Sequence, residues 1–151
     1  ALTIGTLDGA NIEIMEAVGA ENAYIFGLTA EEVSAVKPYD PRVFYTIDPL
    51  LKETVDLIRR GFFNPATPDL FHPLIDDLLT VDRFRNLNDF EAYHQAQMQI
   101  DQTYRSIKAW TRKSILNVAR MGWFSSDRTI AEYNRDIWHA ETVTVTRDDQ
   151  K

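Results

Sequence analysis

Residues 2–27 read LTIGTLDGANIEIMEAVGAENAYIFG, and their pattern predicts a strand, a helix and a second strand. The opening segment is short and rich in β-branched side chains, and Asp8-Gly9 predicts the turn that ends the first strand. Helix formers follow, with Asp8 as the candidate N-cap and Gly19 at the position of a C′ glycine. The apolar run 23–26 is continuous, which is typical of a buried parallel strand. We therefore expect a right-handed βαβ unit.

The rest of the chain carries signals for a series of helices. Thr29 and Glu32 have the spacing of a capping box. Asp48 precedes Pro49, the pattern of an N-cap followed by proline at the first helical position. Pro73 is expected to open or kink a further helix. A mainly helical segment is therefore predicted after the βαβ unit.

The longest periodic pattern is expected to form a helix that begins at Asn88, capped by Asn88 together with Glu91. Side chains that recur every three to four residues predict a seam packed against other helices. The members of this seam are Phe90, Tyr93, Gln97, Ile100, Tyr104 and Ile107. A further helix is predicted over about 109–121, and Ser125-Ser126-Asp127 is expected to cap the last one.

These patterns predict an α/β fold with three segments: a βαβ unit over 1–27, a helical remainder over 28–141 and a tail over 142–151. Within the tail, residues 142–146 alternate Thr and Val, a pattern with strand propensity. This segment is expected to be either a third strand or a frayed end. Because two strands do not make a stable sheet alone, we expect the sheet to lack its other strands. The start at Ala1, without Met, suggests a processed or excised piece.

Composition excludes several classes of protein. The 151 residues carry a formal net charge of −7 and are 44% hydrophobic, which is ordinary for a globular domain. The acidic balance argues against binding of nucleic acid and against a polybasic membrane surface. No stretch has the ~18 apolar residues of a membrane span. The absence of cysteine rules out a disulfide framework and a thiolate site, and it fits a reducing cytoplasm.

The histidines and the first glycine-rich turn are weak candidates for a metal or phosphate site. His72, His94 and His139 lie more than twenty residues apart, and none has a second ligand at helical spacing. The run from Gly5 to Gly9 lacks the spacing of a dinucleotide or nucleotide phosphate loop. Surface histidines and a tight strand-to-helix turn are the simpler interpretations.

The carboxyl-terminal third holds residue types that catalysis and recognition also use. Ser125, Ser126, Asp127 and His139 could supply a hydrolase triad, but there is no nucleophile elbow, and helix capping explains the serines more simply. Arg128 could bind a carboxylate or another domain, or it could be solvated. The aromatic residues there are typical of a core or an interface, although sugars and bases also stack on such rings; they are Trp110, Trp123, Phe124, Tyr133 and Trp138. Local chemistry thus predicts no catalytic, cofactor-binding or metal-binding residue.

Several runs of sequence nevertheless resemble the α-glucan phosphorylases, the family of glycogen, maltodextrin and starch phosphorylases. The runs follow the family's order over nearly the whole chain: 1–13 (ALTIGTLDGANIE), 22–27 (NAYIFG), 61–63 (GFF), 68–71 (PDLF), 90–93 (FEAY), 110–111 (WT) and 124–130 (FSSDRTI). The resemblance is to the last portion of the carboxyl-terminal domain only, and it is loose between about Lys37 and Asp56.

This resemblance implies a parent enzyme that cleaves α-1,4-glucans with phosphate and releases glucose 1-phosphate. It implies pyridoxal phosphate as the parent's cofactor and a fold of two Rossmann-like (GT-B type) domains. In the family, the lysine that holds the cofactor stands in a G-T-G-N-M-K run just before the residues that match Ala1. None of this chain's lysines has that context; they are Lys37, Lys52, Lys108, Lys113 and Lys151.

The resemblance therefore predicts a non-catalytic piece that binds no cofactor by itself. Its expected partners are the upstream part of the same enzyme and, for the parent, glucan and phosphate. A cytoplasmic, allosteric, homodimeric parent is expected, with no nucleic-acid or membrane partner. Two alternatives remain open: a free-standing helical interaction domain, and a nucleotide-sugar transferase of similar architecture.

Overall fold

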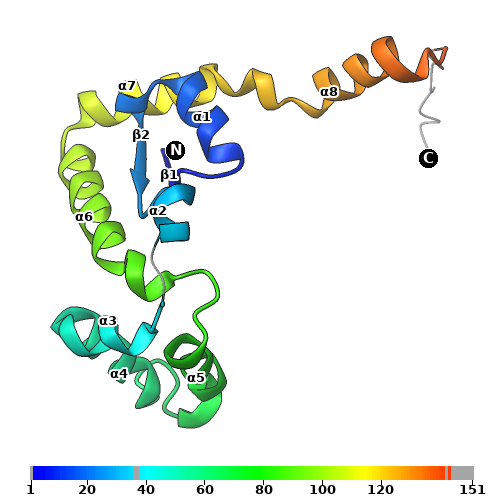
Figure 1. Cartoon of the computed structure of the whole chain (residues 1–151). Helices are drawn as coiled ribbons and strands as arrows, with labels where there is room; N and C mark the ends of the chain where they lie inside the picture. The colour runs from blue at the N-terminus through cyan, green and yellow to red at the C-terminus, as the bar shows by residue number, and fades with distance from the viewer. Residues whose placement is uncertain (1, 36–37, 142, 144–151) are drawn as a thin grey trace, which may run out of the picture.

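A computed structural model describes residues 2–35, 38–141 and 143 of the chain, and it is mainly helical (Figure 1). Two strands and eight α-helices lie in the described part, with short 3-10 turns and one π-helical turn between or after them. The elements are, in chain order, β1 (Thr3–Thr6), α1 (Ala10–Val18), η1 (Ala20–Asn22), β2 (Ala23–Phe26), α2 (Ala30–Ala35), α3 (Pro41–Ile47), α4 (Pro49–Arg59), η2 (Pro68–Phe71), α5 (His72–Thr80), α6 (Asn86–Arg105), α7 (Ile107–Ala119), η3 (Met121–Phe124), α8 (Ser126–Tyr133) and the π-helical η4 (Asn134–Trp138).

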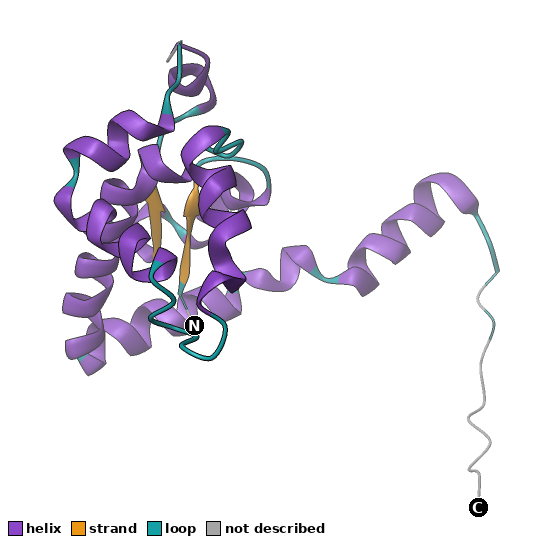
Figure 2. Cartoon of the chain, turned by 90° about the horizontal axis from the view of Figure 1, so that it is seen from below, coloured by secondary structure: helices purple, strands orange, loops and turns teal. Residues whose placement is uncertain are grey.

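The two strands are parallel and are connected through α1 and η1, which confirms the predicted strand–helix–strand unit. The register pairs Thr3 with Ala23 and Thr6 with Phe26, so both strands end at the same edge of the sheet. Figure 2 shows helices on both sides of this strand pair. The prediction that Asp8 caps α1 was wrong. Gly9 is the N-cap residue, and the Asp8 carboxylate accepts a hydrogen bond from the Thr6 hydroxyl instead.

The predicted helix starts in the middle of the chain are confirmed. The Thr29 backbone N–H donates to the Glu32 carboxylate at 2.8 Å, and the Glu32 N–H donates to the Thr29 hydroxyl at 3.3 Å. The first of these bonds lowers the pKa of Glu32. The Asp48 carboxylate accepts from two amides in the first turn of α4, and Pro73 lies in the first turn of α5. Each cap satisfies amides that a helix cannot pair internally.

A compact apolar cluster holds α3, α4 and α5 against the start of α6. Its buried members are Leu51, Val55, Ile75 and Leu87, and Ile75 is fully buried. In Figure 1 these helices form a group below the strand pair, and α6 runs from this group up past β2. Burial of a leucine or isoleucine side chain contributes about 1.5–3 kcal/mol, so this cluster is a main source of stability for the lower group.

The prediction for the longest helix was partly wrong at both ends. α6 begins at Asn86, two residues before the predicted cap, and the side chain of Asn88 donates to Asp89 rather than capping the helix. The seam does not continue to Ile107, because α6 ends at Arg105 and Ser106 caps a separate helix, α7. The side chain of Ile107 is 82% exposed.

Asparagine side chains join α7 to the βαβ unit. Asn117 is buried; its Oδ1 accepts from the Thr3 hydroxyl at 3.2 Å, and its Nδ2 donates to the Asn22 carbonyl at 2.8 Å. Asn22 in turn donates to the Val18 carbonyl at 2.9 Å. Because every one of these groups has a partner, a polar connection can persist at a buried contact.

Beyond α7 the chain leaves the rest of the molecule. In Figure 1 the segment η3–α8–η4, called here the arm, extends away from the strand pair. Several large apolar side chains of the arm are exposed: Trp123, Phe124, Ile130, Tyr133, Ile137 and Trp138. The predicted alternation at 142–146 lies outside the described residues, apart from Val143. Within the described part, none of the helices is both long and apolar enough to cross a membrane.

Candidate functional site

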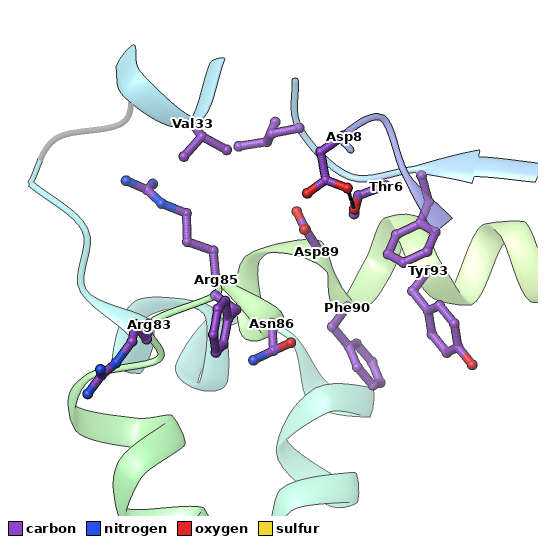
Figure 3. A pocket seen from close by; sticks show the side chains of 12 residues that line it. Thr6, Asp8, Val33, Arg83, Arg85, Asn86, Asp89, Phe90 and Tyr93 are labelled. Atoms are coloured by element: carbon purple, nitrogen blue, oxygen red, sulfur yellow. Dashed lines mark hydrogen bonds between the residues drawn. The ribbon is translucent and has the colours of Figure 1, made fainter. Parts of the chain in front are cut away.

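A pocket of about 650 Å³ lies at the edge of the sheet where both strands end (Figure 3). Its walls come from the ends of β1 and β2, from α2, from the connection between α5 and α6, and from the first turns of α6. Ligands of open parallel sheets bind outside the carboxyl ends of the strands, so this pocket is the candidate functional site. It is lined by Thr6, Asp8, Phe26, Leu28, Val33, Arg83, Phe84, Arg85, Asn86, Asp89, Phe90 and Tyr93.

The β1 side of the pocket is a hydrogen-bonded turn. The Thr6 hydroxyl donates to the Asp8 carboxylate at 3.0 Å, and Asn11 Nδ2 donates to the Thr6 carbonyl at 3.0 Å. A Cβ atom on Gly5 would lie 2.4 Å from Asn11 Nδ2. Glycine at this position therefore lets Asn11 reach back over the strand and fix the turn. The Gly5–Gly9 run is thus a tight strand-to-helix turn.

The α6 side of the pocket is positioned by Asp82, which is only 2% exposed. Its carboxylate accepts from the backbone amides of Asn86 at 2.9 Å and Leu87 at 2.8 Å. It also accepts from the Tyr39 hydroxyl at 2.5 Å. Burial and this neighbouring carboxylate raise the pKa of Tyr39. Asp82 thereby fixes both the start of α6 and the segment that leads into α3.

Three charged residues from this region line the pocket, namely Arg83, Arg85 and Asp89. Asp89 reaches toward the space beside Asp8 and Thr6 in Figure 3. Gly27 has φ +78°, and a Cβ atom there would lie 2.8 Å from Asp89 Oδ2, so glycine both adopts this backbone and admits the carboxylate. The Arg85 guanidinium lies 4.8 Å from the centroid of the Tyr39 ring.

The chemistry of the lining combines carboxylates, guanidinium groups and aromatic rings. The rings of Phe26 and Tyr93 meet edge to face, with centroids 5.2 Å apart. Such a lining can bind a polar ligand through hydrogen bonds and ring contacts. Among the described residues, the lining contains no histidine, cysteine or lysine. The described lining therefore supplies neither an imidazole nor an amine for a Schiff base.

The three histidines lie apart from this pocket and from one another. His72 Nε2 is 3.0 Å from the Arg59 carbonyl and 3.6 Å from Asp69. His94 is 3.9 Å from Glu91, and His139 ends η4 with φ 51°. Over residues 2–35, 38–141 and 143, no three metal-ligating side chains come close enough to hold an ion.

The serines at the start of α8 act at a helix end. The Ser125 hydroxyl accepts from the Arg128 amide at 3.5 Å, as the capping interpretation predicts. His139 lies at the far end of the arm, beyond η4. Asp127 lies in the first turn of α8, where a carboxylate complements the helix dipole.

Arg128 is engaged within the arm. Its guanidinium donates to both carboxylate oxygens of Glu132, at 3.0 and 3.1 Å, and it lies over the Trp123 ring. The other aromatic residues also pair locally, Tyr104 with Trp110 edge to face and Tyr133 stacked on Trp138. The arm thus has an ordered internal set of contacts and an apolar surface that remains exposed.

Two of the described lysines, Lys113 and Lys52, have local structural contacts. Lys113 Nζ donates to the Glu21 carbonyl and lies 5.4 Å from the centroid of the Tyr24 ring. Lys52 pairs with Asp56 at 2.7 Å, and the hydrogen bond raises the pKa of Lys52 and lowers that of Asp56. Lys37 and Lys151 lie outside the described residues.

Sequence reasoning missed Asp82, Arg85 and Asp89. A signal for Asp82 was present, because an aspartate shortly before a helical pattern is a cap candidate. The pattern was obscured because Asp82 and Arg85 both have positive φ, at 38° and 57°. That backbone moves the capping side chain four residues ahead of the first helical residue, outside the usual N-cap spacing.

The parallel strands and the helices around them give the chain an α/β architecture, with a pocket at the carboxyl ends of the strands. Comparison with known proteins is more specific: the sequence model for carbohydrate phosphorylase matches residues 1–140. The chain belongs to the carbohydrate phosphorylase family.

Individual relatives agree with this assignment. The chain is 53% identical over 143 residues to the brain form of glycogen phosphorylase from Homo sapiens, an alignment that covers 93% of this chain and 17% of that protein. It is 51% identical over 151 residues to a glycogen phosphorylase from Synechocystis sp., covering 99% of this chain and 18% of that protein. The liver form from Ovis aries is 48% identical over 147 residues. The chain thus spans less than a fifth of the length of these relatives.

Proposed function

We propose that this chain is the carboxyl-terminal part of an α-glucan phosphorylase, whose complete form transfers glucosyl units from α-1,4-glucan to phosphate and gives glucose 1-phosphate. The observation that carries the proposal is the family match over residues 1–140, together with about 50% sequence identity to glycogen phosphorylases. The chain covers only 17% of the human relative, so the activity is assigned to the complete enzyme and not to these residues alone.

Within that enzyme, we assign the chain to a Rossmann-like domain of the GT-B type, with residues 1–27, 28–141 and 142–151 as its three segments. The parallel pairing of β1 and β2 supports this assignment, because parallel sheets are normally larger and covered on both faces. In the described part of the chain β1 pairs with β2 alone. Its free edge is a place where a strand from the remainder of the enzyme can add.

The exposed apolar side chains of the arm also support the proposal that the chain is part of a larger enzyme. Trp123 is 60% exposed and Ile137 is 61% exposed, although both are large and apolar. Exposed apolar surface of this kind marks an interaction site. The partner proposed is the upstream part of the same polypeptide, whose length in the relatives exceeds that of the present chain several-fold.

The described lining of the strand-end pocket does not fit pyridoxal phosphate, the cofactor that the family resemblance implies. A Schiff base needs an accessible lysine in a pocket that also holds the phosphate. Among the described residues no lysine lines the strand-end pocket. Lys113 lines a separate pocket beside β2, where its Nζ donates to the Glu21 carbonyl, and Lys52 pairs with Asp56. We therefore assign the cofactor to the complete enzyme and expect residues 1–151 to bind none and to be inactive. We assign no catalytic, cofactor-binding or metal-binding residue to residues 1–151.

The remaining properties follow from the proposed parent. Its partners are glucan and inorganic phosphate, and it is a cytoplasmic, allosterically regulated homodimer with no nucleic-acid or membrane partner. The net charge of −7 supports the exclusion of nucleic acid.

Two assays in parallel test the proposal. The complete product of the gene that encodes this chain should release glucose 1-phosphate from glycogen and phosphate, whereas residues 1–151 should release none. With added pyridoxal phosphate, residues 1–151 should show no stoichiometric Schiff-base absorbance that borohydride abolishes. Absence of phosphorolysis by the complete product would refute the assigned function.

A borohydride-sensitive band at one equivalent per chain would instead refute the expectation that residues 1–151 bind no cofactor. Peptide mapping after reduction would then identify the lysine. Lys113→Gln is the matched variant, because Lys113 lines a pocket beside β2 and does not line the strand-end pocket.

A further inference from the structure

We draw no further inference here: the strongest candidate, the apolar groove between α3 and the first turns of α6 lined by Phe44, Ile47 and Leu87, carries none because nothing in the structure shows what covers it.

Discussion

Replacing Asp82 with alanine should lower the free energy of unfolding by about 2–4 kcal/mol, because one carboxylate serves several donors at a buried junction. The Asp82 side chain accepts from the amides of Asn86 and Leu87, from the Asn86 side chain at 3.1 Å, and from the Tyr39 hydroxyl. Alanine removes the acceptor and leaves these donors in place.

The expected loss of unfolding free energy combines two contributions. Loss of a side-chain cap costs about 0.5–2 kcal/mol. A hydrogen bond to a charged group contributes about 1.5–3 kcal/mol, and here the Tyr39 hydroxyl loses its partner. These losses are not fully additive, because the donors share one carboxylate. Asp82→Asn keeps one acceptor oxygen and tolerates the φ of 38°, so it should cost less than alanine.

Urea unfolding followed by far-ultraviolet circular dichroism measures the effect. With a slope of about 2 kcal/mol/M, the midpoint of Asp82→Ala should fall by about 1–2 M. Asp76→Ala is the matched control, since Asp76 is exposed on α5 and pairs with Arg59 at the surface. Such a pair contributes about 0–1 kcal/mol. If Asp82→Ala unfolds at the same urea concentration as Asp76→Ala, the role assigned to the carboxylate is wrong.

Three other results are expected. Ser125→Ala should cost about 0.5–2 kcal/mol and Ser126→Ala much less, because only the Ser125 hydroxyl accepts from the first turn of α8; equal urea midpoints would contradict this. The folded state raises the pKa of Tyr39 above its ordinary value of 10, so this group contributes stability below pH 10 that is lost as the pH rises further; Tyr39→Phe should remove that part of the alkaline slope in unfolding titrations. Amides of β1 should exchange hydrogen faster than those of α6 in residues 1–151, and the isolated chain should self-associate through the open edge. A monodisperse monomer with β1 fully protected would instead favour a free-standing domain.

Much of the secondary structure could be predicted because its causes are local. The capping box at Thr29 and Glu32 needs only residues three apart, and the Asp48-Pro49 start needs only its own first turn. The parallel strand at 23–26 was predictable from its continuous apolar run, since both of its faces are covered. The family was predictable as well, because the quoted runs keep their order along the chain.

The candidate site was not predictable, because it depends on contacts between residues far apart in the chain. Asp8 and Asp89 line one pocket only after α6 has packed against β2, the strand that pairs with β1. The start of α6 depends on Asp82, whose hydrogen bond to Tyr39 spans 43 residues and whose backbone has an unusual positive φ.

The sequence by itself determined the caps of α2, α4 and α8, the strand–helix–strand order and the family. Tertiary structure alone decided where α6 begins and ends, which side chains line the pocket, and which apolar residues stay exposed on the arm. The physical reason is that hydrogen bonds within one turn are specified by adjacent residues. Burial, by contrast, depends on which surfaces meet, and a period of three to four residues does not show whether a partner surface is present.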